Sequence, residues 1–219
     1  MTQFQFGEIT LERHSVGPLG ENTYFLFDSS KTGFIFDPGD EAERLLSRIR
    51  ELEFKPKAIL LTHAHFDHIG AVEPLRLELG IPVFLHPLDL EIYRAGHSSA
   101  ARYNLSFTQP KDPDTFLEPG QILEAGSIRL EVRFVPGHAP GHVVFVGKAT
   151  PNQHFLIAGD TLFRESIGRT DLPGGNLEQL LSGIRAQIFI LPDDTKIFSG
   201  HGPETTVGFE KKHNPFLNR

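Results

Sequence analysis

The chain has 219 residues, of which 39% are hydrophobic and 22% charged, so it can bury a sizeable core as an ordinary globular protein. Its net charge of −7 and the absence of a basic cluster argue against a nucleic-acid partner. The absence of cysteine excludes disulfides, thiolate metal ligands and a cysteine nucleophile. Neither a secretory signal nor an apolar run of about 18 residues is visible, so we expect no membrane partner and a cytoplasmic location.

The predicted elements alternate between strands and helices. In chain order we expect strands at residues 22–27 and 34–37, a helix at 41–53, a strand at 57–61, a helix at 69–80, a strand at 83–85 and a helix at 87–93. Strands at 128–135, 143–146 and 155–158, a helix at 177–189 and a strand at 196–198 follow. Residues 95–120 interrupt the pattern, which is typical of a functional or mobile segment. Two strand-rich halves, each covered by helices, predict one α/β sandwich domain over residues 1–219.

Four potential metal ligands follow the strand predicted at 57–61, namely His63, His65, Asp67 and His68. Side chains two residues apart in an extended segment leave on the same side, so His63 and His65 can meet one ion. Asp67 and His68 come as the chain turns into a helix and therefore face another direction. This run predicts that one strand end supplies two neighbouring ions. The alternative is a histidine-rich surface turn in which Asp67 only caps the helix.

Three later strands also end in turns that carry a ligand residue beside glycine, and these residues are His138, Asp160 and His201. Loops at one edge of a sheet converge, and glycine lets the backbone approach an ion closely. The repetition favours a metal site more strongly than any single match. His142 lies in the same turn as His138, and spacing alone does not choose between these two histidines.

This ordered set of turns, from about residue 22 to residue 215, resembles the metallo-β-lactamase superfamily of αββα hydrolases. The early DPGD turn at 37–40 matches a structural turn of that superfamily. The segments GDTLF at 159–163, SIGRTDLPG at 166–174, GHGPETT at 200–206 and NPF at 214–216 resemble its glyoxalase II-like branch. The resemblance implies a four-layer αββα sandwich.

The resemblance also implies two divalent metal ions, with zinc expected and iron or manganese compatible with nitrogen and oxygen ligands. The first ion would be held by His63, His65 and His138. The second would be held by Asp67, His68 and His201, with Asp160 bridging both ions. A metal-bound hydroxide would then hydrolyse a small-molecule thioester such as S-lactoylglutathione. Asp67 would also be catalytic, orienting the nucleophile or moving a proton.

Other activities share many of these turns. A persulfide dioxygenase, which uses one iron held by two histidines and an aspartate, is the main alternative, and a lactonase-type hydrolase is another. The ligand residues alone do not separate these enzymes. A non-catalytic metal-binding protein fits less well, because degenerate members lose ligands and this chain lacks none. β-Lactamases with cysteine in the second site are excluded by composition.

Candidate substrate contacts come from the pocket walls expected at residues 163–175 and 93–107. Arg164 and Arg169 could pair with a substrate carboxylate, and Tyr93 is a further candidate. The alternative for Arg169 is an ion pair with Asp171 that holds its loop. Only 18 residues follow His201, too few for the helical domain that contacts glutathione in glyoxalase II enzymes. We therefore expect weak binding of the glutathione portion.

Overall fold

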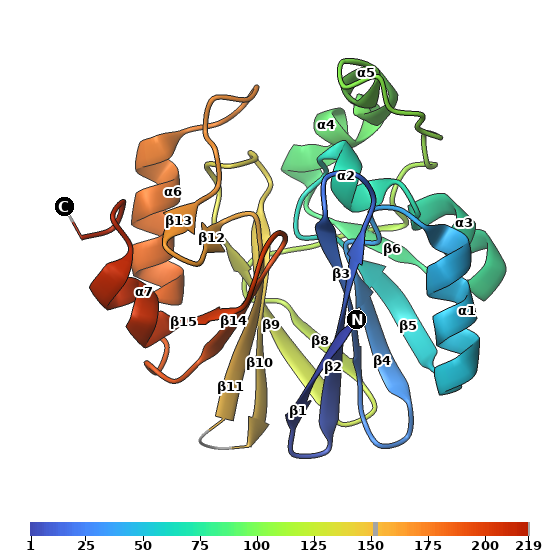
Figure 1. The fold of residues 1–219 in the computed structure, drawn as a ribbon, viewed down its shortest axis with the longest axis horizontal. Coiled ribbons are helices and arrows are strands. Elements are labelled where there is room, and N and C mark those ends of the chain that lie inside the picture. The colour runs from blue at the N-terminus through green and yellow to red at the C-terminus, as the bar shows by residue number, and fades with distance from the viewer. Residues whose placement is uncertain (151–152, 219) are drawn as a thin grey trace.

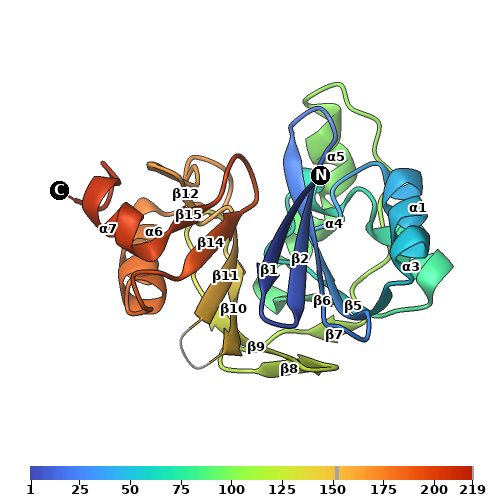
Figure 2. The ribbon, with the colours of Figure 1, turned by 60° about the horizontal axis from the view of Figure 1, so that its bottom comes forward.

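The computed structural model describes residues 1–150 and 153–218. Two β-sheets pack face to face, and helices cover the outer face of each sheet (Figure 1). Figure 2 shows the same layers from a second direction, with α6 and α7 on one outer side and α1 and α3 on the other. The four-layer αββα sandwich that the resemblance implied is confirmed.

The N-terminal half forms one sheet in the order β1-β2-β3-β4-β5-β6-β7. Its strands are β1 (Thr2–Phe6), β2 (Ile9–Val16), β3 (Glu21–Phe27), β4 (Thr32–Phe36), β5 (Lys55–Leu60), β6 (Val83–Leu85) and β7 (Thr115–Phe116). The pairs from β1 to β4 are antiparallel, and those from β4 to β7 are parallel. The parallel part needs helical crossovers, and these place helices on the outer face.

The C-terminal half forms a second sheet in the order β15-β14-β11-β10-β9-β8. Its strands are β8 (Ile122–Ala125), β9 (Ile128–Phe134), β10 (Val143–Thr150), β11 (Gln153–Gly159), β14 (Lys196–Ser199) and β15 (Thr205–Thr206). A short hairpin of β12 (Leu162–Phe163) and β13 (Ser166–Ile167) follows β11. In this sheet β11 and β14 run parallel, so the chain segments that follow both strands emerge at the same edge.

The helices are α1 (Ala42–Leu52), α2 (Phe66–Ile69), α3 (Val72–Leu79), α4 (Leu90–Arg94), α5 (Gly96–Ala101), α6 (Leu177–Gly183) and α7 (Val207–His213). A 3₁₀ turn, η1 (Pro87–Asp89), precedes α4, and a π-helical stretch, η2 (Ile184–Ile188), continues α6. Within the described ranges, no helix has the length and apolarity needed to cross a bilayer.

Three apolar layers hold the sandwich together. The central layer lies between the sheets and contains Leu26, Phe36, Phe145 and Phe198, among others. A second layer packs α1 and α3 on the N-terminal sheet, and a third packs α6, η2 and α7 on the C-terminal sheet. Strands such as β4 are therefore buried on both faces, which explains their nearly continuous apolar sequences.

The structure departs from the sequence-based prediction in several places, and β8, the β12–β13 hairpin, β15 and α7 were not predicted. The N-terminal strands β1 and β2 were not predicted, and β2 lacks a clear apolar pattern because it buries Glu12 and His14. The segment 95–120, predicted to be irregular, contains α5 and β7. The helix predicted at 177–189 changes from α to π geometry after Gly183.

A buried ion pair joins α1 to β2. Glu12 is fully buried, and its two carboxylate oxygens accept hydrogen bonds of 3.1 and 2.9 Å from the guanidinium of Arg48. His14 Nε2 lies 3.4 Å from the same carboxylate. Burial alone would raise the pKa of Glu12, but the hydrogen bonds from His14 and Arg48 lower it to about 2. This carboxylate therefore contributes stability only while it is ionised.

We expect Arg48→Met to lower the free energy of unfolding of the metal-free protein at pH 7 by about 3 kcal/mol, because it removes the cationic partner of a buried carboxylate and leaves only His14 beside it. The ordinary pKa of a glutamate is 4.5 and the folded value is about 2. The contribution is therefore complete above about pH 4.5 and is lost as the pH falls towards 2. Urea unfolding at pH 7 and pH 3 should show the difference between wild type and variant shrinking with acid.

The matched control for this prediction is Arg50→Met on the same helix. Arg50 pairs with Glu78 at 2.7 Å, but both side chains are more than half exposed. Such a pair contributes at most about 1 kcal/mol. Equal destabilisation by the two substitutions would contradict the role given to Glu12.

Candidate metal centre

The ends of four strands place the predicted ligands at one edge of the sandwich. His63 and His65 follow β5, and α2, in the upper half of Figure 1 below α4 and α5, carries Asp67 and His68. The turns after β9, β11 and β14 carry the three remaining ligand candidates, His138, Asp160 and His201. The structure thus brings together residues that lie up to 138 positions apart in the sequence.

These side chains form two adjacent groups. In the first, His63, His65 and His138 offer ligand atoms that all lie within 4.8 Å of one another. His65 Nδ1 is 2.9 Å from His138 Nε2. The second group satisfies the same limit and consists of Asp67, His68 and His201. We call these groups the three-histidine set and the mixed set.

Asp160 lies between the two sets. One carboxylate oxygen is 3.5 Å from His68 Nε2. The other is 3.6 Å from His138 Nε2 and 3.7 Å from His201 Nε2. One carboxylate therefore faces a nitrogen atom of the three-histidine set and nitrogen atoms of the mixed set, which is the position expected of a bridging ligand.

Asp37 and Thr62 fix the ring orientation of two of these histidines. Asp37 accepts hydrogen bonds from the Thr62 amide and hydroxyl, at 2.7 and 2.6 Å. Because the Thr62 hydroxyl donates to Asp37, it accepts from His63 Nδ1, which is 3.0 Å away. His68 Nδ1 lies 3.2 Å from the same Asp37 carboxylate. Both rings are thereby turned so that Nε2 faces the centre.

Other contacts orient the remaining ligands. His138 Nδ1 donates to the backbone oxygen of Arg169 at 2.8 Å, which leaves Nε2 free to bind an ion. His142 Nε2 accepts a 3.0 Å hydrogen bond from the Asp160 amide. The His142 ring also stacks on His63, with centroids 4.7 Å apart. His142 therefore supports the ligands and belongs to neither set.

Two glycines allow this close packing. Gly137, directly before His138, has a φ of +128°, a conformation that side chains rarely adopt. Gly200, directly before His201, has no room for a side chain, because a Cβ atom would lie 2.2 Å from Asp160 Oδ1. The sequence expectation that glycine permits close approach at these turns agrees with the geometry.

Burial and neighbouring charges shift the pKa values of the candidate ligands. Burial lowers the pKa of His63 and His138, so both rings are neutral and keep a lone pair for an ion. Burial acts on His68 in the same direction, but the carboxylates of Asp160 and Asp67 outweigh it and raise the pKa of His68 well above its usual value. For Asp160, burial opposes ionisation, yet His68 lowers the pKa of that carboxyl. His68 thus takes the place of a cation beside the carboxylates of Asp160 and Asp67.

The donor set fits divalent metal ions. Among the described residues, His63 Nε2, His68 Nε2 and Asp160 Oδ1 are buried without a hydrogen-bond partner. Such atoms carry a free-energy cost that metal ligation would remove. Imidazole and carboxylate ligands suit zinc, iron and manganese.

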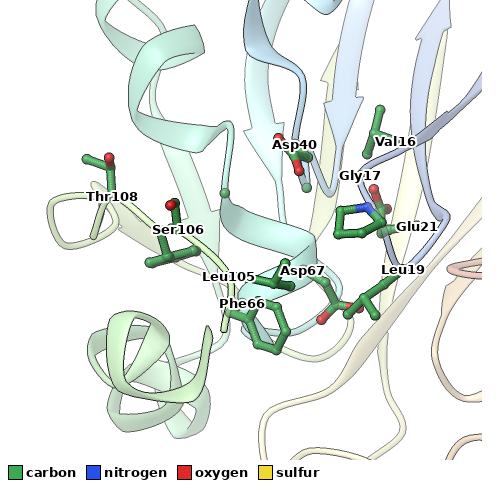
Figure 3. Close-up of a pocket in the computed structure, with 14 residues that line it drawn as sticks. Val16, Gly17, Leu19, Glu21, Asp40, Phe66, Asp67, Leu105, Ser106 and Thr108 are labelled. Carbon is green, nitrogen blue, oxygen red and sulfur yellow. The ribbon is translucent and has the colours of Figure 1, made fainter. Parts of the chain in front are cut away.

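A cavity of about 260 Å³ opens beside the mixed set (Figure 3). It lies between the β2–β3 turn, α2 and the segment that follows α5. Its lining includes the apolar residues Leu19, Phe66, Leu105 and Phe107 and the carboxylates of Glu21, Asp40 and Asp67. No lysine or arginine is among its described lining residues. The wall expected at residues 93–107 is thus partly present, whereas the segment 163–175 does not line this cavity.

The substrate contacts expected from the sequence need correction. Tyr93 does not face the site, because its ring is fully buried in the core beneath α4 and its hydroxyl donates to Lys111 O at 2.9 Å. The Arg164 guanidinium lies over the Phe209 ring, 4.5 Å from its centre. Arg169 forms two hydrogen bonds with Asp171, at 2.7 and 2.8 Å. Neither arginine lines the cavity beside Asp67.

Several supporting residues were missed by the sequence analysis. The sequence drew attention to the turn at 37–40 but gave no sign that Asp37 reaches His68. Asn22 Nδ2 donates to the backbone oxygens of Ser199 and Gly202, at 3.0 and 2.9 Å, and so holds the turn that carries His201. Backbone contacts of this kind leave no pattern in a single sequence.

Comparison with known proteins agrees with this geometry. Residues 16–201 match the Metallo-beta-lactamase superfamily. "Hydroxyacylglutathione hydrolase GloC" of Haemophilus influenzae is 40% identical over 200 residues, which are 90% of this chain and 93% of that protein.

Two solved structures are also similar along nearly the whole chain. The BLEG-1 B3 metallo-beta-lactamase gives a TM-score of 0.87 at 40% identity, covering 95% of this chain and 100% of that one. TTHA1623 in a di-iron-bound form gives 0.82 at 42% identity, covering 94% and 100%. The chain therefore belongs to the metallo-β-lactamase superfamily, whose members bind divalent metals, and it is similar to the glyoxalase II-like branch.

Proposed function

We propose that this protein is a binuclear metal-dependent hydrolase that acts on thioesters such as S-lactoylglutathione. The observation that carries the proposal is the position of Asp160, whose oxygens lie 3.5–3.7 Å from nitrogen atoms of both ligand sets. A mononuclear site would not need a second complete set. The di-iron-bound form of TTHA1623, at 42% identity, supports two ions.

We propose zinc as the metal in both sets, because three imidazoles or two imidazoles and a carboxylate are frequent zinc ligands. Two bound divalent ions would supply Lewis acidity, lowering the pKa of a shared water towards neutrality and polarising the carbonyl under attack. Asp67 holds His201 through a 3.3 Å contact with its Nε2. The same carboxylate borders the cavity, where it would orient the attacking water or accept its proton.

The lining of the cavity leads us to expect that the site accepts thioesters of thiols other than glutathione. Glutathione carries two carboxylates, and an arginine or lysine would be needed to pair with them. The described lining of the cavity instead presents carboxylates and apolar groups. We therefore propose that the acyl end and the thioester are recognised, while the γ-glutamyl group adds little binding energy. GloC of Haemophilus influenzae, by its name, acts on hydroxyacylglutathione.

The zinc-loaded protein should hydrolyse S-lactoylglutathione, and chelator-treated protein should not. We expect kcat/KM to fall less than about tenfold for a lactoyl thioester of N-acetylcysteinylglycine, which lacks the γ-glutamyl group and whose blocked amine cannot take up the acyl group, with the change mainly in KM. A loss beyond about a hundredfold, or roughly 2.7 kcal/mol, would reveal a dedicated glutathione site. Oxygen uptake with glutathione persulfide and no thioester hydrolysis would instead identify a dioxygenase.

A second candidate function is β-lactam hydrolysis. The BLEG-1 B3 metallo-beta-lactamase, at 40% identity over nearly the whole chain, favours it. A chromogenic cephalosporin assayed beside S-lactoylglutathione separates the two functions. A kcat/KM for the β-lactam that exceeds the value for the thioester would replace the thioesterase proposal.

A further inference from the structure

Asp89 is a buried aspartate outside both ligand sets. It ends the turn η1, directly before α4, and its side chain is fully buried. Its Oδ2 accepts a 3.0 Å hydrogen bond from the amide of Ala64, and its Oδ1 accepts one from the amide of Gly141. One carboxylate thus contacts two chain segments that are far apart in the sequence.

Both amide donors belong to turns that carry ligands. Ala64 stands between His63 and His65, so its amide is part of the backbone that spaces these two ligands. Gly141 lies in the turn that starts with His138 and ends with His142. The Asp89 carboxylate therefore joins the turns that supply all three members of the three-histidine set, and neither of these two hydrogen bonds involves a residue of the mixed set.

The fit between Asp89 and Gly141 leaves no spare room. A Cβ atom at position 141 would lie 2.7 Å from the Asp89 amide nitrogen and 2.8 Å from its Oδ1. Any side chain there would push the His138 turn away from Asp89. Glycine at 141 is therefore required by this contact, although its φ is not positive.

A carboxylate is a costly group to bury here. Burial raises the pKa of Asp89 to about 6, and the groups that oppose this rise are two backbone amides, with no arginine, lysine or histidine among them. Burying an unpaired charge is unfavourable unless hydrogen bonds compensate it. The compensation consists of two charge-assisted bonds to backbone amides, and both amides lie in ligand turns.

We propose that Asp89 is a positioning residue that sets the spacing of His63 and His65 relative to His138 and so tunes the metal affinity of the three-histidine set. The inference rests on the metal-dependent function proposed above. Asp89→Asn replaces one acceptor oxygen with an amide group that faces an N–H donor, so at least one of the two bonds is lost. Loss of such supporting contacts lowers metal affinity about 10- to 100-fold.

Asp28→Asn is the matched control. Asp28 is also a buried aspartate. It accepts hydrogen bonds from the backbone amides of Ser30 and Thr32 in its own turn and of Ser127 in the β8–β9 turn. It follows the last residue of β3, whereas the metal centre lies near the first, a separation on the order of 20 Å along the strand. Its substitution should lower stability without changing metal affinity.

The test measures zinc affinity for each set separately. A His201→Ala background leaves the three-histidine set complete, and a His65→Ala background leaves the mixed set complete. Metal-free protein is titrated with Zn²⁺ in competition with a chromophoric chelator, and thermal unfolding of the metal-free protein records the structural cost of each change.

In the His201→Ala background we expect Asp89→Asn to weaken zinc binding about 10- to 100-fold, and Asp28→Asn to leave it within about threefold. In the His65→Ala background neither substitution should change the zinc affinity. Gly141→Ala, which keeps the carboxylate but displaces the turn, should reproduce the Asp89→Asn effect and serves if that variant does not fold.

Equal zinc affinity with and without Asp89→Asn in the His201→Ala background would overturn the inference. Equal weakening of both sets would also overturn it, because it would indicate general structural damage. Failure of the wild-type protein to bind zinc at all would overturn the proposed function and this inference together. The results named above would overturn this inference alone, so the two failures are distinguishable.

Discussion

Replacing Asp160 with alanine is expected to lower kcat/KM for thioester hydrolysis by about a thousandfold, while the protein remains folded. One oxygen of the carboxylate faces His68, and the other faces His138 and His201. Its removal separates the two ligand sets. Charge stabilisation by metal sites is worth several kcal/mol, and about 4 kcal/mol corresponds to a thousandfold in rate. Steady-state kinetics on zinc-loaded protein measure the loss.

The fold should survive this substitution because Asp160 lies at the end of β11, outside the three apolar layers. Its amide, which bonds His142, is unchanged in the variant. Asp193→Ala is the control, since Asp193 is an exposed carboxylate that pairs with Lys211. If Asp160→Ala kept more than a tenth of the wild-type rate, the bridging role would be wrong.

His65→Ala is expected to remove one zinc ion per chain and to lower kcat/KM by about a hundredfold or more. His65 is a direct member of the three-histidine set, so its loss should cost at least as much as the 10- to 100-fold typical of outer contacts. The mixed set keeps all of its residues. Zinc content and activity measured on the same preparation test both parts of the expectation.

His154→Ala provides the comparison for His65→Ala. His154 lies at the beginning of β11, at the opposite end of the strand from Asp160. It should keep full zinc content and activity. Two tightly held zinc ions in the His65→Ala variant would contradict the assignment of this histidine to the first ion.

The sequence predicts the sandwich and the convergence of the ligands because each ligand turn follows an apolar strand. His63 after β5 and His201 after β14 could be identified from the sequence, because a histidine is unusual directly after an apolar strand. Parallel pairing then brings such ends to one edge. The order and type of these elements could therefore be predicted, although their limits shifted by a few residues.

The supporting contacts could not be predicted because they depend on backbone atoms of distant segments. Asp89 binds two amides that lie 25 and 52 residues away, and nothing in the sequence identifies an amide as its partner. Tyr93 was expected near substrate because it borders an irregular segment. The turn of α4 instead directs its ring into the core. The sequence also gave no sign that Glu12, a charged residue, is buried on β2.

The number of metal ions per chain tests the central claim most directly. The purified protein is loaded with zinc, dialysed mildly and analysed by elemental analysis against its concentration. Two complete ligand sets with a shared Asp160 predict more than one ion per chain, approaching two with excess zinc. A stoichiometry near one that excess zinc does not raise would contradict the binuclear hydrolase and favour a mononuclear enzyme.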